Sequence, residues 1–146
     1  MPLHPEYQAL LEQLAEVGGP ALTDMTPDEG REMYRTAQPE APDIAVANVT
    51  DRSIAGPAGD IPIRIYTPNG DGPHPIVVMF HGGGWVIGDL VTADAQSREV
   101  CSGVGAVVIS VDYRLAPEHK FPAAPDDCYA ATVWAAENAA SIGADP

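Results

Sequence analysis

The chain has 146 residues, of which 45% are hydrophobic, and its formal net charge is −14. This length predicts one domain, and the apolar fraction is too high for a disordered chain. The negative charge argues against binding to nucleic acids and to anionic membrane surfaces, because both attract basic proteins. We expect the acidity to serve solubility, with adaptation to high salt as the alternative.

Targeting and membrane-spanning segments are not apparent in the sequence. Residues 1–6 have neither the basic region nor the apolar core of a signal peptide. No apolar run approaches the roughly 20 residues that a transmembrane helix requires. The two cysteines, Cys101 and Cys128, do not form a disulfide framework and are expected to pack in helices. We therefore expect a soluble, cytoplasmic protein.

The first predicted helix covers residues 5–17. Its apolar side chains recur at helical spacing, and Gly18-Gly19-Pro20 should end it. We expect the apolar stripe to pack against the rest of the protein, with a place at a substrate entrance as the alternative. The stripe consists of Tyr7, Leu10, Leu11, Leu14 and Val17.

A second helix is predicted to begin after Thr26. The Thr26 hydroxyl can cap it, Pro27 suits its first position, and Glu29 completes a capping box. The helix should end before residues 39–42, which form a connector rich in proline.

A β-hairpin follows. Residues 61–66 alternate isoleucines with other residues, as in a half-buried strand, and Pro62 confines that strand to an edge or to a non-bonding position. Residues 46–54 are the predicted partner strand, joined to it by a turn at 56–60. The apolar run 76–80 is predicted to be the next strand.

The remaining elements alternate between helix and strand. We predict a helix at 92–104, a strand at 106–111 and a helix from about 122 to 140. This alternation predicts an α/β fold, with a mostly parallel sheet, flanking helices and the antiparallel hairpin at its start. The strand 106–111 would be an apolar edge without a neighbour, so we expect further strands outside this sequence.

The most informative motif follows the strand 76–80 and reads His81-Gly82-Gly83-Gly84-Trp85. Three consecutive glycines contribute no packing, and a chain tolerates them where the backbone approaches a ligand or needs a positive φ. Exposed N–H groups in such a loop can bind the negative oxygen that forms when a carbonyl is attacked. A tight turn without a chemical role is the alternative.

Two motifs together resemble the hormone-sensitive-lipase group, the bacterial family IV carboxylesterases of the α/β-hydrolase fold. They are residues 81–89 and residues 112–124, which follow the third and fourth strands, as in that family. The resemblance covers the whole chain and implies the N-terminal half of such a protein. It implies a helical cap in residues 1–42 and the first half of the hydrolase core in residues 43–146.

The resemblance assigns roles to the glycine loop. The N–H groups of Gly83 and Gly84 would form the oxyanion hole, and His81 and Gly82 would support the loop. His81 is not expected to be the catalytic base, because the order in this fold is serine, acid and then histidine. We expect Trp85 to pack near the site or in the core, with a contact to the substrate as the alternative. Tyr34 of the second helix would line the substrate entrance, as cap residues do in relatives, with packing of the helix face as the alternative.

The nucleophile of such an enzyme is missing from this sequence, because no Gly-x-Ser-x-Gly motif occurs in it. Ser141 lacks the first glycine and follows a helix, Ser97 and Ser102 lie in a predicted helix, and Ser110 lies in a buried strand. The serine, the acid and the base are therefore expected in a C-terminal half of the same protein.

A group of charged residues surrounds the second motif. We expect either an ion-paired scaffold below the active site or ordinary surface and helix-capping charges. His4, His74 and His119 are expected to be solvated. No metal site or phosphate loop is apparent, and no cofactor is expected. The charged group consists of Asp112, Arg114, Glu118, Asp126 and Asp127.

The sequence thus predicts part of a carboxylic ester hydrolase that acts through an acyl-enzyme. Its partners would be a small ester and the C-terminal half of the same protein. By resemblance, the ester would have a short to medium acyl chain, and a second copy of the protein would form a homodimer, as in family relatives. One alternative is a receptor of the same fold, since the plant gibberellin receptors keep the glycine loop without hydrolysing their ligand. The other is an inactive fragment that needs a complementing chain.

Overall fold

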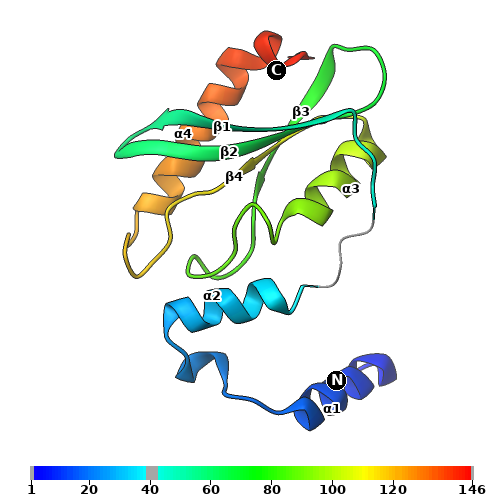
Figure 1. Cartoon of the computed structure of the whole chain (residues 1–146), viewed down its shortest axis with the longest axis vertical. Coiled ribbons are helices and arrows are strands. Elements are labelled where there is room, and N and C mark those ends of the chain that lie inside the picture. The colour runs from blue at the N-terminus through cyan, green and yellow to red at the C-terminus, as the bar shows by residue number, and fades with distance from the viewer. Residues whose placement is uncertain (1, 39–42, 146) are drawn as a thin grey trace.

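The structure, a computed structural model, describes residues 2–38 and 43–145. A five-stranded sheet has the strand order β1-β2-β4-β3-β5. Helices α3 and α4 lie on opposite sides of this sheet, and α1 and α2 lie beyond its loops (Figure 1). The elements are α1 (Pro5–Val17), η1 (Leu22–Asp24), α2 (Pro27–Thr36), β1 (Asn48–Gly56), β2 (Gly59–Thr67), β3 (His74–Phe80), α3 (Asp94–Val104), β4 (Val107–Val111), α4 (Ala123–Asn138), η2 (Ala139–Ile142) and β5 (Ala144–Asp145).

The sheet is mixed, with an antiparallel start as predicted. β1 and β2 form the hairpin, and β2 also pairs antiparallel with β4. β3 pairs in parallel with β4 and with β5. Pro62 lies opposite Ser53, just outside the part of β2 that pairs with β4, where its missing N–H breaks no ladder bond.

The prediction that residues 106–111 form an edge strand is wrong. β4 lies between β2 and β3, and all five of its residues are buried. The connection through α3 places β4 inside the existing sheet, so order along the chain does not give order in the sheet. The open side belongs to β3, whose pairing with β5 in the described part of the chain covers only His74 and Pro75.

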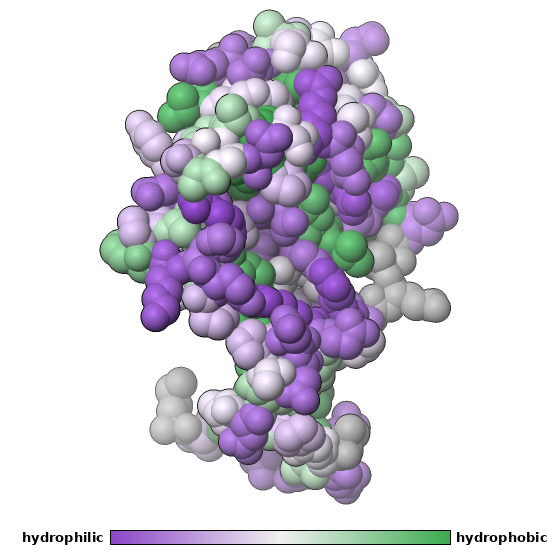
Figure 2. Space-filling model, turned by 60° about the vertical axis from the view of Figure 1, so that its left-hand side comes forward, coloured by the Kyte–Doolittle hydropathy of each residue, from purple (hydrophilic) through white to green (hydrophobic). Residues whose placement is uncertain are grey.

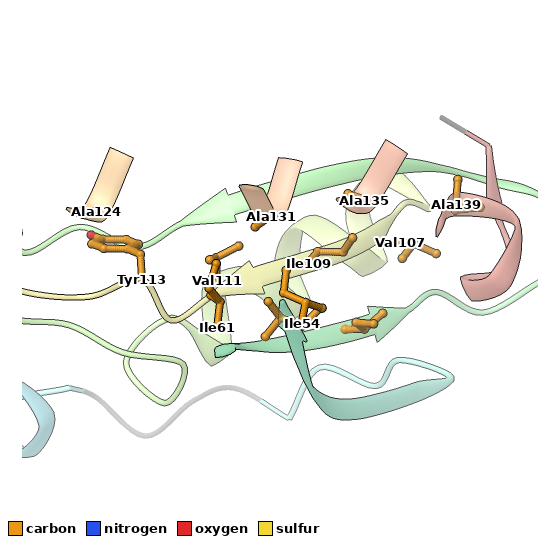
Figure 3. Packing of buried hydrophobic residues seen from close by; sticks show 13 residues of the cluster. Ile54, Ile61, Val107, Ile109, Val111, Tyr113, Ala124, Ala131, Ala135 and Ala139 are labelled. Carbon is orange, nitrogen blue, oxygen red and sulfur yellow. The ribbon is translucent and has the colours of Figure 1, made fainter. Parts of the chain in front are cut away.

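The larger core lies between the sheet and α4. Ala131 and Ala135 of α4 pack on strand residues such as Ile109 (Figure 3), and the small alanine side chains let the helix approach the sheet closely. A smaller core on the α3 side contains Tyr66 and Cys101. Both cysteines are free, as expected, and lie in helices.

The two N-terminal helices form where they were predicted. The capping box is complete, because the Thr26 hydroxyl accepts from the Glu29 N–H while the Glu29 carboxylate accepts from the Thr26 N–H. The expected packing of the α1 stripe is not seen, since Tyr7, Leu10, Leu11 and Leu14 are exposed in the described chain. The predicted connector 39–42 lies outside the described residues.

One buried ion pair ties the loop after β4 to α4. Asp127 is only 1% exposed, and its carboxylate accepts from the backbone N–H and the guanidinium of Arg114 at 2.8–3.0 Å. Of the two roles considered for Asp127, the structure therefore shows the ion-paired scaffold, because α4 has no side-chain cap.

Replacement of Asp127 tests this scaffold. Asp127→Ala should lower the free energy of unfolding of the full-length protein by about 3 kcal/mol, because the donors of Arg114 lose their acceptor. The neighbouring Asp126 is exposed, so Asp126→Ala should change the free energy of unfolding by no more than about 0.5 kcal/mol. Urea unfolding measures both, and equal effects would contradict the assignment.

Candidate functional site

The glycine loop leaves the end of β3 in a backbone conformation that favours glycine. Gly83 has φ 131° and Gly84 has φ 60°. A Cβ atom on Gly83 would lie 2.0 Å from the carbonyl oxygen of Ile87, so no other residue fits there without moving backbone. Trp85 is the only described non-glycine residue with a positive φ, at 62°.

Two carbonyl groups of the glycine loop accept hydrogen bonds from the side chains of His81 and Tyr113. The Tyr113 hydroxyl donates to the His81 carbonyl at 2.6 Å, and His81 Nδ1 lies 2.9 Å from the Gly82 carbonyl. Since a carbonyl oxygen only accepts, Nδ1 carries the proton. C=O and N–H point in opposite directions across a planar trans peptide, so these bonds direct the N–H groups of Gly82 and Gly83 away from His81 and Tyr113.

The third carbonyl of the loop is held by the backbone. The Gly83 oxygen accepts from the N–H of Val86 at 3.1 Å and from the N–H of Ile87 at 3.0 Å. The same peptide geometry then fixes the direction of the Gly84 N–H. Three successive peptide planes are therefore oriented before any ligand arrives.

The N–H groups of Gly83 and Gly84 have no acceptor among residues 2–38 and 43–145. Backbone donors seldom stay unpaired, so a fixed pair without acceptors is suited to a ligand. Both glycines line a cavity of about 290 Å³ together with Trp85, Tyr113 and Cys128. Donors arranged in this way can stabilise an oxygen on which negative charge develops.

His81 is a packed support of this loop. It is 8% exposed, and its ring stacks on Tyr113 with centroids 4.3 Å apart and an angle of 12° between the rings. Burial raises the pKa of Tyr113 to about 12, so its hydroxyl remains a donor at neutral pH. A Cβ atom on Gly88 would lie 2.3 Å from His81 Nδ1. The absence of a side chain at Gly88 thus makes room for the ring.

The two residues considered as substrate contacts occupy different surroundings. Trp85 is 65% exposed, so it does not pack in the core of the described chain, and it lines the cavity beside the glycine loop. Tyr34 is half-buried on α2 and is not among the residues that line this cavity. A second cavity of about 320 Å³ lies between the glycine loop and the N-terminal residues, including Leu22 and Met25.

Two arginines attach α2 to the loops around the site. Arg31 forms a bidentate pair with Glu118 at 2.7 and 2.9 Å, and Arg35 pairs with Asp89. The Arg31 guanidinium lowers the pKa of Glu118 to about 2. Hydrophilic side chains gather where the N-terminal part meets the sheet (Figure 2). Polar contacts therefore hold α2 over the glycine loop.

The remaining candidates differ in accessibility, and His119 lines a further cavity of about 430 Å³ together with Gly84 and Trp85. Ser97 and Ser110 are fully buried, in α3 and β4. His119 is exposed, and burial raises the pKa of Asp112, which is half-buried. Within the described ranges, no three His, Cys, Asp or Glu side chains gather as metal ligands. No helix there is both long and apolar enough to span a bilayer.

Comparison with known proteins gives the geometry a context. A family model described as alpha/beta hydrolase fold matches residues 77–146. The esterase of the archaeon Pyrobaculum calidifontis superposes with a TM-score of 0.90 at 40% identity, covering 99% of this chain and 47% of that one. The chain belongs to the α/β-hydrolase family. It spans the N-terminal half of that fold.

Curated relatives of this α/β-hydrolase chain are named as esterases. The carboxylic ester hydrolase LipN of Mycobacterium tuberculosis is 56% identical over 100 residues, which are 68% of this chain and 27% of LipN. The arylesterase of Saccharolobus solfataricus is 40% identical, over 99% of this chain and 48% of that enzyme. The chain therefore spans about a quarter to a half of the length of these relatives.

The glycine loop is apparent in the sequence, but the residues that fix its conformation are not. Tyr113 and Gly88 stood within the two motifs, yet their contacts with His81 depend on how β3 and β4 lie side by side. Arg31 carried no signal beyond its place on a polar helix face. Glu118 forms an ion pair with Arg31, which matches one of the two roles that the sequence left open for the charged group around the second motif.

Substitution at Gly88 tests the support by His81. Gly88→Ala should force the imidazole out of its place, destabilise the full-length protein by about 1–3 kcal/mol through overpacking, and weaken the bond to the Gly82 carbonyl. Gly70→Ala is the matched control, since Gly70 also has a positive φ, 108° compared with 97° for Gly88, but a Cβ atom on Gly70 would meet no atom within 4 Å. Thermal unfolding and the NMR shifts of the His81 ring measure the effect; an unmoved ring in Gly88→Ala would contradict it.

Proposed function

We propose that the full-length protein is a carboxylic ester hydrolase that transfers an acyl group to water through a serine acyl-enzyme, and that this chain supplies its oxyanion-binding loop. One observation carries the proposal, namely that the N–H groups of Gly83 and Gly84 have no acceptor in the described part of the chain while their peptide planes are held by donors to the carbonyls of Gly82 and Gly83. The names of the relatives, esterase and carboxylic ester hydrolase, support the same chemistry.

In the proposed reaction, a serine of the C-terminal half attacks the ester carbonyl, and a histidine accepts the serine proton. The carbonyl π electrons move onto oxygen, and the N–H groups of Gly83 and Gly84 donate to that oxyanion. Collapse of the tetrahedral intermediate expels the alcohol, which takes the proton from the histidine. Water then attacks the acyl-enzyme in the same manner and releases the acid.

The surroundings of the loop favour a small ester with an apolar acyl or alcohol part. Trp85 borders the cavity beside the glycines, while Leu22, Met25 and Ile87 border the one under the N-terminal helices. Apolar walls with few polar groups are typical of sites for small molecules. We keep Trp85 as a substrate contact and assign Tyr34 a place in α2 nearer the entrance.

We also propose four further features that were expected from the sequence. These are the division at residue 42 into a cap and a hydrolase core, membership in the hormone-sensitive-lipase group, a cytoplasmic location and a homodimer. The motifs at 81–89 and 112–124 support the group, and the separate position of α1 and α2 in Figure 1 supports the cap.

Kinetics of the full-length protein test the proposal. The wild type should hydrolyse p-nitrophenyl acetate or butyrate, and Gly83→Ala should lower kcat by roughly 100- to 1000-fold, because its Cβ would displace the loop. Gly70→Ala is the matched control, since Gly70 also has a positive φ, 108°, but its Cβ would meet nothing.

The outcomes separate the alternatives. An inactive wild type would contradict the proposal, and saturable binding of an ester without turnover would identify a receptor of the same fold. Equal loss of activity in both variants would assign the effect to backbone strain and not to the oxyanion loop.

A further inference from the structure

We propose that Arg31 of α2 is a positioning residue for the oxyanion hole, acting on the Gly84 N–H through a chain of hydrogen-bonded peptide groups. The inference rests on the proposed function, and it adds a role for an N-terminal residue that is remote from the reacting atoms. Arg31 does not contact the glycines themselves; its nearest bonded group in that segment is the Val86 carbonyl.

Every N–H of the Arg31 guanidinium has an acceptor. Nε donates to the Val86 carbonyl at 2.9 Å, and Nη2 donates to the Ala116 carbonyl at 3.1 Å. The remaining donors bind both oxygens of Glu118 and one of Asp28. The side chain is 22% exposed. With all donors engaged in a planar fork, the guanidinium has a single orientation.

The first route from Arg31 to the oxyanion hole passes through two peptide groups. The Val86 carbonyl that accepts from Arg31 belongs to the same peptide as the Ile87 N–H. That N–H donates to the Gly83 carbonyl at 3.0 Å, and the Gly83 carbonyl belongs to the same peptide as the Gly84 N–H. Each peptide is planar, so the guanidinium orients the Gly84 N–H through two rigid units.

A second route joins the same carbonyl from the other motif. The Ala116 N–H donates to the Trp85 carbonyl at 2.8 Å, and the Val86 N–H of that peptide donates to the Gly83 carbonyl at 3.1 Å. Arg31 holds the Ala116 carbonyl at the same time. The Ile87 N–H therefore belongs to a peptide that Arg31 binds directly. The Val86 N–H belongs to a peptide that is bound by Ala116, whose own carbonyl Arg31 binds.

The charge of Arg31 strengthens this arrangement. A cation at the start of a hydrogen-bonded chain polarises each peptide in turn, so each N–H becomes a better donor. The last N–H of the chain is that of Gly84, where the oxyanion would form. Docking of α2 and stabilisation of the oxyanion are thereby coupled: when α2 leaves, the Val86 carbonyl loses its charged donor.

A purely structural role of Arg31 makes a different prediction. If Arg31 only attached α2, then Arg35, which pairs with Asp89 from the same helix, would be equivalent to it. Among the described residues, the Arg35 side chain makes no hydrogen bond to residues 81–88. Arg35→Met is therefore the matched control for Arg31→Met, with the same change on the same helix.

The test uses the full-length enzyme with p-nitrophenyl esters and a trifluoromethyl ketone that forms a tetrahedral oxyanion adduct. Arg31→Met should lower kcat on the order of tenfold, while KM stays within about twofold of the wild-type value. The affinity for the ketone should fall by a factor similar to that of kcat. The amide proton resonance of Gly84 should move upfield, as expected for a weaker donor. Arg35→Met should leave kcat, ketone affinity and the Gly84 resonance unchanged.

Arg31→Lys keeps the proposal testable if Arg31→Met fails to fold. A lysine keeps the charge for Glu118 but cannot hold the Val86 and Ala116 carbonyls in a planar fork, so kcat should still fall several-fold. Wild-type kcat in Arg31→Lys, equal losses in Arg31→Met and Arg35→Met, or a rise in KM alone would each overturn the role of Arg31. Those results leave the proposed function standing, whereas a wild type without esterase activity contradicts both.

Discussion

The orientation of three successive peptide planes in the glycine loop is the constraint on which this site depends. Glycine permits the backbone path, but it also leaves the peptides free to rotate, so the N–H groups need an external restraint. Donors to the carbonyls supply it: Tyr113 to His81, the His81 ring to Gly82, and the turn at residues 86–87 to Gly83. Such preorganisation avoids reorganisation when charge develops on a bound oxygen.

The rest of the fold brings these donors to the loop. The parallel pairing of β3 with β4 places the segments that follow both strands side by side, so Tyr113 reaches the carbonyl of His81. The Arg114–Asp127 pair holds the segment after β4 on α4, and Arg31 and Arg35 hold α2 over both loops. The support of two glycine N–H groups thus extends across elements far apart in the sequence.

Most local structure was predictable from the sequence, because it depends on neighbouring residues. The capping box at Thr26, the hairpin and the buried run of β4 follow from spacing and composition. The position of β4 inside the sheet did not follow, because it depends on how the chain crosses over between strands. Three adjacent glycines were enough to predict the oxyanion-binding loop that we propose, whereas the contacts of Gly88, Tyr113 and Arg31 are created only by folding.

The most direct test of the account is a crystal structure of the full-length protein with a phosphonate bound covalently to its serine. The account predicts that the phosphoryl oxygen lies about 3 Å from the nitrogens of both Gly83 and Gly84. It also predicts that the carbonyls of His81, Gly82 and Gly83 keep the donors they have now. A phosphoryl oxygen bound away from these two N–H groups would contradict the account. So would a flipped glycine peptide whose carbonyl faces the phosphoryl oxygen.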